Sequence, residues 1–351
     1  MDNYYIIYFL ILGVFSFFYF TSSPKKNFIL IYIISLFFVV YFGTRSEEIG
    51  SDTQSYKWVY TRYIETSDNL PDYINKHSEK SFIFTRLVYF TVKEFGFNTF
   101  LILVALMEIG MFLLGIYYLK KVLKENEKFN DIILLVLLYG MSFFFININV
   151  NIILNGLAIF TFLLSFISYL NKKYFISILF LIASLDFHIS IAIPFLAILI
   201  VNYSKNIDIK YFYALFIIGI FISFFEINLF GDYSILFDNI SDNKFDSYIN
   251  FDETEYRIGF RLDFVVFNAI FLIPSLLYKN KSIELISKYF CITSFVFFIS
   301  SQLIYNDRIG LYSWMAIPMI LYLFVEEKKT SFYKVMTYVL YLSINLVLTL
   351  K

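Results

Sequence analysis

The run FILIYIISLFFVVYFG (residues 28–43) is followed directly by TRSEEIGSDTQSYKWVY (residues 44–60). As a helix, these sixteen uncharged residues would be about 24 Å long, a little shorter than the hydrocarbon core of a bilayer at roughly 30 Å. Runs of this kind recur along all 351 residues, of which 59% are hydrophobic and only 16% are charged. The mean hydropathy is +0.70. The pattern predicts an all-α, polytopic integral membrane protein built as a single transmembrane domain.

The apolar runs predict about twelve transmembrane helices. They lie at residues 4–20, 28–43, 98–119, 131–147, 151–170, 174–186, 189–202, 211–227, 263–279, 285–305, 308–325 and 331–350. The two short runs on either side of His188 are predicted either as two tilted helices or as a re-entrant pair. The first run follows MDN, which lacks the basic region of a signal peptide, so residues 4–20 are predicted as a retained span.

Lysine predicts the orientation of these spans. The short connections that alternate to one side carry sixteen lysines and no arginine. By the positive-inside rule, this side is cytoplasmic. A span at residues 81–95 would place the lysines of residues 120–128 outside. This segment is therefore predicted as an amphipathic or re-entrant helix on the outer face, with Arg86 and Lys93 on one side of it.

The opposite, outer side carries the two long loops, residues 44–97 and 228–262. All the arginines fall on this side: Arg45, Arg62, Arg86, Arg257, Arg261 and Arg308. A guanidinium offers a planar fork that binds phosphate through two parallel hydrogen bonds, whereas an ammonium is a point charge. Long loops in a compact protein commonly carry function. The set predicts an anionic ligand at the outer membrane surface, and for any single arginine a surface salt bridge is the alternative.

Several classes of function are excluded by composition. The formal net charge is zero and there is no basic stripe, so nucleic acid is not expected as a partner. One cysteine, Cys291, rules out a disulfide framework and a thiol metal site. The chain shows no glycine-rich phosphate loop, no Ser-His-Asp order and no metal-ligand spacing. We therefore expect neither a metal ion nor another cofactor.

Polar residues wedged between apolar runs are the remaining candidates for a site. His188, in SLDFHIS, sits at the predicted outer boundary, where it is either a helix-capping residue or a functional one. Asp307 and Arg308 stand between two spans with hardly any loop. They form either a salt bridge at a helix end or part of a site, because an idle buried charge costs several kcal/mol.

These motifs resemble those of the Wzy/EpsG-type bacterial surface-polysaccharide polymerases. In that family an arginine, a G-x-D motif and a tyrosine follow an early span. A glutamate then precedes an amphipathic segment. Farther along the chain come three more elements: H-x-S, G-F-R-x-D-F and an arginine with a nearby tyrosine. The matching positions in this chain are Arg45, Gly50-Ser51-Asp52, Tyr56, Glu79, His188-Ile189-Ser190, Gly259–Phe264, Arg308 and Tyr312. The resemblance covers residues 40–325. One departure is Leu154-Asn155, where the family often carries Arg-Gln in the middle of an N-x-x-R-Q-x-L-A motif.

The resemblance implies a fold similar to that of the C-type glycosyltransferases and a specific reaction. Such polymerases join oligosaccharide repeat units carried on undecaprenyl diphosphate, at the outer face of the bacterial cytoplasmic membrane and without a metal ion. His188 is the implied general base, with Asp52 and Glu79 as alternatives. The implied ligands of the diphosphate and the sugars are Arg45, Arg86, Arg257, Arg261, Arg308, Tyr56, Asp263, Asp307 and Tyr312.

The expected partners are the lipid-linked donor and acceptor, membrane lipid, and a chain-length regulator or export protein. A flippase for the same lipids and a ligase that moves finished glycan to another acceptor stay open as alternatives. Against the flippase, the sequence shows no inverted repeat and no matching pair of interrupted spans.

Overall fold

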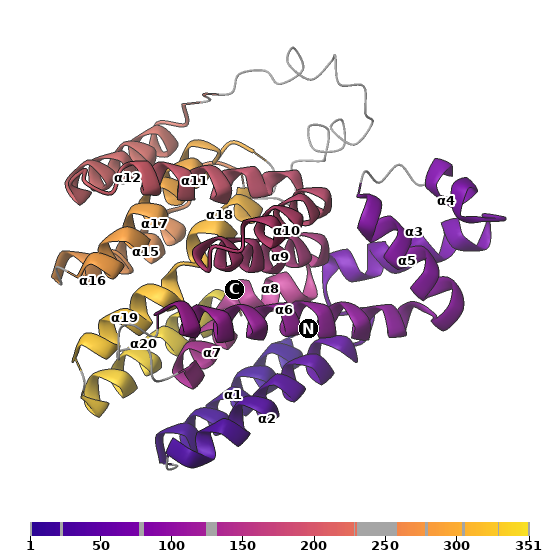
Figure 1. Cartoon of the computed structure of the whole chain (residues 1–351), viewed down its shortest axis with the longest axis horizontal. Helices are drawn as coiled ribbons and strands as arrows, with labels where there is room; N and C mark the ends of the chain where they lie inside the picture. The colour runs from indigo at the N-terminus through magenta and orange to yellow at the C-terminus, as the bar shows by residue number, and fades with distance from the viewer. Residues whose placement is uncertain are drawn as a thin grey trace. The chain divides into compact units, whose positions relative to one another are not determined.

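A computed structural model describes residues 2–21, 24–76, 81–123, 132–227, 229, 258–277, 280–303, 306–328 and 330–349, and every regular element within these ranges is helical (Figure 1). Most of the predicted second outer loop, residues 228–262, lies outside the described residues, as do Glu79 and Arg257. The all-α class predicted from the apolar runs is confirmed.

The described helices make this a multi-pass membrane protein. Six of them are long and apolar enough to cross a bilayer, and a seventh span is formed if the bent pair Ile132–Gly140 and Phe143–Val150 is counted as one. Five shorter apolar helices of 10–17 residues occupy the places of the other predicted spans. The number twelve includes these shorter helices and stays a prediction.

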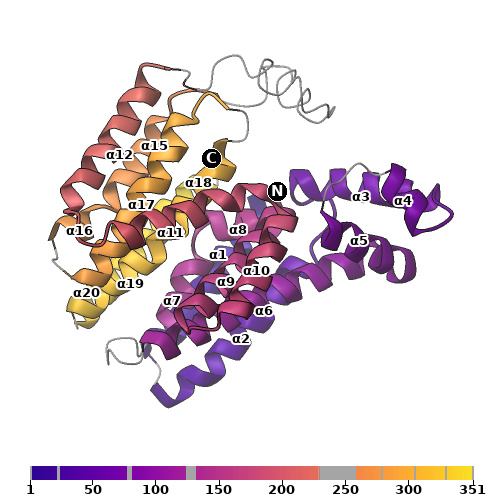
Figure 2. The ribbon, with the colours of Figure 1, turned by 45° about the horizontal axis from the view of Figure 1, so that its top comes forward.

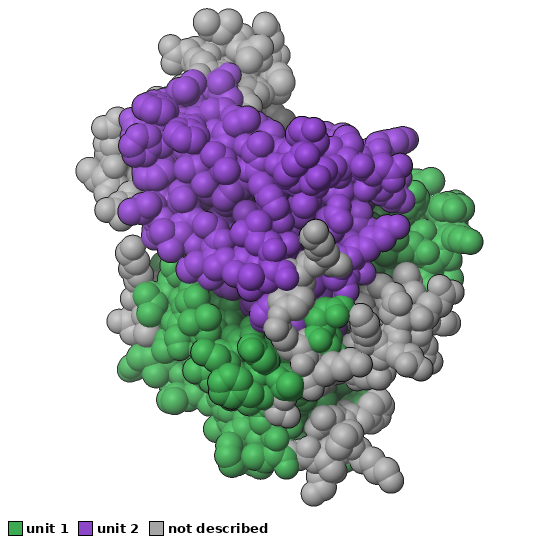
Figure 3. Space-filling view, turned by 90° about the vertical axis from the view of Figure 1, so that its left-hand side faces the viewer, with its two compact units in different colours: residues 1–192, 325–351 green, residues 193–324 purple. Residues whose placement is uncertain are grey.

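The chain divides into two compact units, residues 1–192 with 325–351 and residues 193–324 (Figure 3). In the first unit, α6 packs against both α2 and α9, and α9 packs against α10. Its elements are α1 (Asp2–Thr21), α2 (Pro24–Gly43), α3 (Ser51–Glu65), α4 (Leu70–Lys76), α5 (Phe82–Phe95), α6 (Phe97–Leu123), α7 (Ile132–Gly140), α8 (Phe143–Val150), α9 (Ile153–Leu170), α10 (Tyr174–Phe187), the 3₁₀ helix η1 (Ile189–Ile191) and α20 (Ser331–Thr349).

The second unit is built around α17, which packs against α12 and α18. Its elements are α12 (Ile209–Phe224), α15 (Leu262–Ile270), α16 (Ile273–Leu277), α17 (Lys281–Ile299) and α18 (Asn306–Trp314). Two helices contribute residues to both units: α11 (Ala192–Tyr203) and α19 (Ile317–Lys328). The predicted spans 263–279 and 308–325 each contain a short turn, after α15 and after α18, and the second still counts as one spanning helix, Asn306–Glu327.

The predicted span 131–147 is broken into α7 and α8, which meet at an angle of 69°. A break inside a membrane frees backbone groups that must find partners within the protein. The Gly140 carbonyl accepts a hydrogen bond from Tyr8 Oη at 2.7 Å, and Phe143 N donates to Asn345 Oδ1 at 2.9 Å. Side chains of α1 and α20 therefore stabilise the break.

The helices α3, α4 and α5 pack together beside the start of α6 (Figures 1 and 2). The helix α5 coincides with the segment predicted at residues 81–95. Its buried face includes Phe84, Val88 and Val92, whereas Phe82 and Phe90 are exposed. This distribution is typical of an amphipathic helix at an interface.

Candidate functional site

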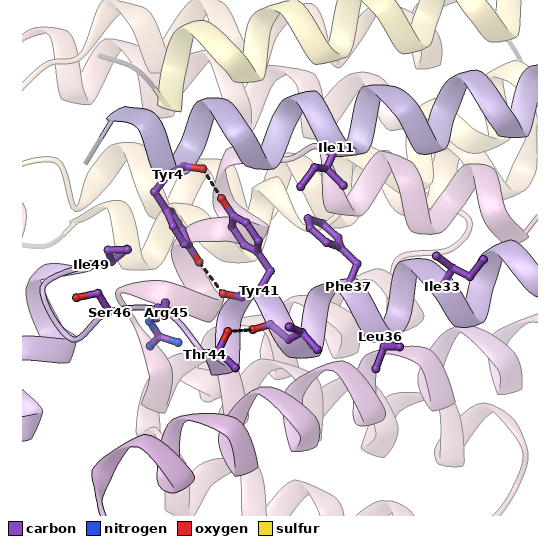
Figure 4. A pocket seen from close by; sticks show the side chains of 11 residues that line it. Tyr4, Ile11, Ile33, Leu36, Phe37, Tyr41, Thr44, Arg45, Ser46 and Ile49 are labelled. Carbon is purple, nitrogen blue, oxygen red and sulfur yellow. Dashed lines mark hydrogen bonds between the residues drawn. The ribbon is translucent and has the colours of Figure 1, made fainter.

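A groove of about 620 Å³ runs along α1 and α2 of the first unit (Figure 4). Most of its wall is apolar, and one end is formed by Thr44, Arg45 and Ser46, where α2 has just ended. The full lining is Tyr4, Ile11, Ile33, Leu36, Phe37, Val40, Tyr41, Thr44, Arg45, Ser46 and Ile49. The groove therefore has a long apolar wall and one cationic end.

Two tyrosines tie α1 to α2 beside this cationic end (Figure 4). Tyr4 Oη donates to the Tyr41 carbonyl at 3.1 Å, and Tyr41 Oη donates to the Tyr4 carbonyl. Their rings lie 4.5 Å apart, centroid to centroid. The reciprocal pair fixes the spacing of the two helices where the groove meets Arg45.

The guanidinium of Arg45 is held by neutral oxygen atoms. Nη1 donates to the Phe42 carbonyl, and Nη2 donates to Thr53 Oγ1 at 3.1 Å and to the Val150 carbonyl at 3.3 Å. Within the described part of the chain, no carboxylate is paired with it. Burial lowers the pKa of the Arg45 guanidinium, and the fields of Tyr4 and Glu108 oppose that shift. An arginine nevertheless stays protonated in proteins, so a cation stands at this end of the groove.

The chain reaches this arrangement through the break between α8 and α9. Because the helix stops there, the Val150 carbonyl is free to accept from Thr53 Oγ1 at 2.9 Å as well as from Arg45. Gly50 has φ +94°, and a Cβ at this position would lie 2.7 Å from the Val150 carbonyl oxygen. The glycine of the G-x-D motif is thus required both by its backbone conformation and by close approach to the break.

Two further predicted residues lie on α3, directly after this turn. The helix begins at Ser51, and its N-cap is Gly50. Asp52 is therefore the second residue of the helix. Tyr56, four residues later, stacks on Tyr60 with 5.3 Å between ring centroids.

His188 ends α10 and caps η1. Its backbone is extended, with φ −155° and ψ 121°. Ring Nδ1 lies 2.5 Å from Ser190 Oγ and accepts from Ser190 N at 3.3 Å. The H-x-S element therefore has a local structural role as a capping pair. The predicted role of His188 as general base stays a prediction.

A carboxylate that the sequence analysis missed connects α10 to α5. Asp186 accepts hydrogen bonds from Ser81 Oγ at 3.0 Å, Phe82 N at 2.9 Å and Ile83 N at 2.8 Å, which covers the first turn of α5. Arg86 lies on that helix, with Nη1 donating to the Phe82 carbonyl and its guanidinium 3.3 Å from the centre of the Phe82 ring. His188 and Arg86 thus belong to elements that Asp186 ties together.

In the second unit, Arg261 and Asp263 form a pair with two hydrogen bonds. Nε donates to Oδ1 at 3.0 Å and Nη2 to Oδ2 at 2.7 Å, while the guanidinium lies 4.3 Å from the centre of the Phe264 ring. Gly259, with φ +99°, donates its N–H to the Ser301 carbonyl at 2.9 Å. Arg261 therefore forms a salt bridge in this structure, which was the alternative to binding an anionic ligand.

The remaining predicted residues of this unit lie on α18. Asp307 and Arg308 occupy its first turn and are half-buried, and Tyr312 is buried one turn later. Asn306, at the start of the helix, accepts a hydrogen bond from Ser300 Oγ at 2.7 Å. The two charged residues therefore lie at the start of the span Asn306–Glu327 and not at its middle.

Glu108 is a further residue that sequence analysis missed. It is wholly buried in α6, and neither carboxylate oxygen has a hydrogen-bond partner among the described residues. The signal was available in FLILVALMEIGMFLLGIYYL, where one carboxylate interrupts a long apolar run. An ionisable residue inside a membrane span is a candidate functional residue.

Comparison with protein-family models places residues 28–351 in the EpsG family. The match covers nearly the whole chain, including the groove lining from Ile33 onward, Arg45, and both units. No curated protein and no solved structure matches the chain.

Proposed function

The chain belongs to the EpsG family of Wzy-type polysaccharide polymerases, and from this premise we propose that it joins undecaprenyl-diphosphate-linked oligosaccharide repeat units into a surface polysaccharide. The proposed location is the bacterial cytoplasmic membrane, with the site facing outward. The lysine-rich connections support this orientation.

The groove along α1 and α2 is the observation that carries the proposal. A lipid-linked diphosphate has a long apolar chain and a compact anionic head, and the groove offers an apolar wall and one cationic end. Arg45 is held there by neutral oxygens, so its charge is not consumed by a carboxylate in contact with it. We propose that the prenyl chain lies against Leu36 and Ile33 and that the diphosphate binds at Arg45.

The proposed reaction is a glycosyl transfer. A hydroxyl oxygen of the acceptor unit attacks the anomeric carbon of the donor glycan, and the bond from that carbon to the diphosphate oxygen breaks. The diphosphate lipid leaves with the electron pair, and the hydroxyl proton passes to a base. Arg45 stabilises the charge that develops on the leaving diphosphate. In this proposal arginines, and not a metal ion, supply that stabilisation.

The base and the sugar ligands are proposed from the sequence motifs. His188 is the first candidate for the base, with Asp52 and Glu79 as alternatives. Arg86, Arg261 and Arg308 are proposed as further contacts of the diphosphate or the sugars. The pairing of Arg261 with Asp263 means that Arg261 must exchange its carboxylate for a phosphate to take part.

A gel of lipid-linked glycans from cells that lack this protein tests the proposal. We expect single repeat units to accumulate on the lipid at the outer face, because export is intact and polymerisation is lost. Long unattached chains would identify a ligase instead, and units trapped on the inner face would identify a flippase. Expression of the wild-type protein from a plasmid is the control and should restore long chains.

A further inference from the structure

The side chain of Asp186, near the end of α10, is bonded to the start of α5, 103 to 105 residues away in the sequence. Oδ1 accepts from Phe82 N at 2.9 Å, and Oδ2 accepts from Ile83 N at 2.8 Å and from Ser81 Oγ at 3.0 Å. The first N–H groups of a helix have no acceptor within that helix, so this carboxylate satisfies two of them. The proposed reaction assigns Asp186 no part.

The helix α5 already has a cap from its own segment. Ser81 is the N-cap residue, and its Oγ accepts a hydrogen bond from Phe84 N at 3.1 Å. Thr85 Oγ1 donates to the Ser81 carbonyl at 2.6 Å. Because these local hydrogen bonds are present, what Asp186 adds is a fixed position for the first turn of α5 relative to α10.

Phe82, the first residue of α5, connects this carboxylate to Arg86. Arg86 Nη1 donates to the Phe82 carbonyl at 2.9 Å, and the guanidinium carbon lies 3.3 Å from the centre of the Phe82 ring. Among the described residues, both contacts that hold the guanidinium are therefore made with Phe82. Since Phe82 N donates to Asp186, the place of the guanidinium depends on that carboxylate.

The guanidinium of Arg86 keeps most of its donors for a ligand. One of its five N–H groups donates to the Phe82 carbonyl, and no carboxylate pairs with it in the part of the chain that the structure describes. Arg86 is half-buried beside the exposed Phe82 ring. A guanidinium that is stacked on a ring and bonded to a carbonyl has few rotamers left, so it loses little entropy when it binds an anion.

We propose that Asp186 is a positioning residue for Arg86: by fixing the first turn of α5, it holds the guanidinium in place for the diphosphate of the lipid-linked donor. This inference rests on the proposed function and narrows the ligand of Arg86 to the diphosphate, because a guanidinium without a carboxylate partner favours an anion. Asp186 acts through Phe82 and does not contact the ligand. Without its hydrogen bonds the first turn of α5 frays, and the ring that carries the guanidinium moves.

Asp186 also lies two residues before His188, the proposed base. A loss of activity in an Asp186 variant would therefore not by itself identify Arg86 as the residue through which it acts. A double-mutant cycle separates the two routes, because residues that act through one another have non-additive effects.

The cycle combines Asp186→Asn with Arg86→Gln in the purified full-length protein in detergent, and the polymerisation rate on lipid-linked repeat units is measured. We expect Arg86→Gln to slow polymerisation roughly ten- to a hundredfold, the range for a lost hydrogen bond to a charged group, and Asp186→Asn to slow it roughly tenfold. In the Arg86→Gln background, Asp186→Asn should change the rate less than about twofold. Unfolding midpoints are measured on the same samples.

Phe82 offers a second variant that leaves the hydrogen bonds of Asp186 intact. Phe82→Leu removes the ring beneath the guanidinium and should slow polymerisation about two- to fivefold, the range for an exposed cation–π contact. Phe82→Tyr keeps the ring and should restore the wild-type rate. Ser81→Ala is the matched control for helix capping, because it removes the local cap and leaves the backbone hydrogen bonds to Asp186. Its rate should stay close to that of the wild type.

An equal loss from Asp186→Asn in the wild-type and the Arg86→Gln backgrounds would overturn the inference and identify the His188 turn as the route. A wild-type rate in either Asp186→Asn or Arg86→Gln would overturn it as well. If Asp186→Asn does not accumulate, the same cycle with Phe82→Leu decides between the outcomes. If the wild-type protein itself makes no polymer, the proposed function fails, which is a separate result.

Discussion

Arg45 combines an observed structural role with a proposed functional one. Its hydrogen bonds stabilise the turn after α2 and the break before α9, which is a structural task. Its charge forms the end of the groove, which is the proposed functional one. The two roles can be tested separately. Thr53 also donates a hydrogen bond to the Val150 carbonyl at the break but carries no charge.

Replacing Arg45 with Lys should abolish most polymerisation while the protein still accumulates. Lysine keeps the charge but loses the planar fork that binds both a carbonyl and a phosphate. Thr53→Val is the matched control, since it removes the hydroxyl bond to the Val150 carbonyl and leaves the arginine. We expect each variant to lose about 1–2 kcal/mol of unfolding free energy. On a gel of the glycans, the polysaccharide should be much shorter than in the wild type only for Arg45→Lys.

Similar loss of polymer in Thr53→Val and Arg45→Lys, at similar stability, would mean that Arg45 serves only the helix break. Accumulation in the membrane and the unfolding midpoint in detergent are measured in parallel, so that folding and function are separated.

At the scale of elements, helix breaks and tertiary caps place the polar residues. The break between α7 and α8 is stabilised by Tyr8 and Asn345, and that between α8 and α9 by Thr53 and Arg45. Asp186 covers the start of α5 from another helix. At each of these two breaks and at the start of α5, a polar side chain lies inside an otherwise apolar unit.

Asp186→Ala should loosen α5 without unfolding the unit. Two backbone N–H groups and the Ser81 hydroxyl would lose their shared acceptor, at a cost of about 1–3 kcal/mol. Hydrogen exchange should accelerate at the amides of Phe82 and Ile83 and remain unchanged in α9. Asp186→Asn, which keeps one acceptor oxygen, should show a smaller effect. Unchanged exchange in α5 would show that Asp186 does not stabilise the first turn of this helix.

Hydropathy predicts where the helices lie, because a long run of apolar residues in a membrane protein indicates a membrane-spanning helix. The positions of α1, α2, α6, α9 and α20 agree with the predicted spans within a few residues. The break at Gly140–Ser142 was not predicted, because its backbone partners Tyr8 and Asn345 are distant in sequence. The role of Asp186 was not predicted for the same reason, because residues 81–83, which donate to it, are distant in sequence.

The candidate site was predicted only in part for a similar reason. Arg45 was identified by its place at the end of an apolar run, and the structure shows a groove there. One of its neutral hydrogen-bond partners, the Phe42 carbonyl, is local, whereas Thr53 on α3 and Val150 on α8 follow from no local pattern. Glu108 had a clear signal in the sequence, a charge inside a span, which the family motifs do not include.

The groove end at Arg45 faces outward only if the protein has the predicted orientation in the membrane. A cysteine introduced at Thr66, which is exposed after α3, should react with an impermeant thiol reagent added to intact cells. A cysteine at Asn206, exposed before α12, should react only after the membrane is permeabilised. The native Cys291 is buried and serves as the unlabelled background. The reverse pattern would overturn the lysine argument and place the groove end on the cytoplasmic side.

The groove that ends at Arg45 is the proposed binding site of the lipid-linked diphosphate. A photoreactive residue introduced at Leu36, in the groove and 64% exposed, is compared with one at Leu340 on α20, 57% exposed and outside the groove. Both are irradiated in membranes that contain lipid-linked repeat units. The account predicts a glycolipid adduct at position 36 that undecaprenyl diphosphate displaces and undecaprenol does not, and little adduct at position 340. Equal adducts at both positions, or displacement by undecaprenol alone, would contradict it.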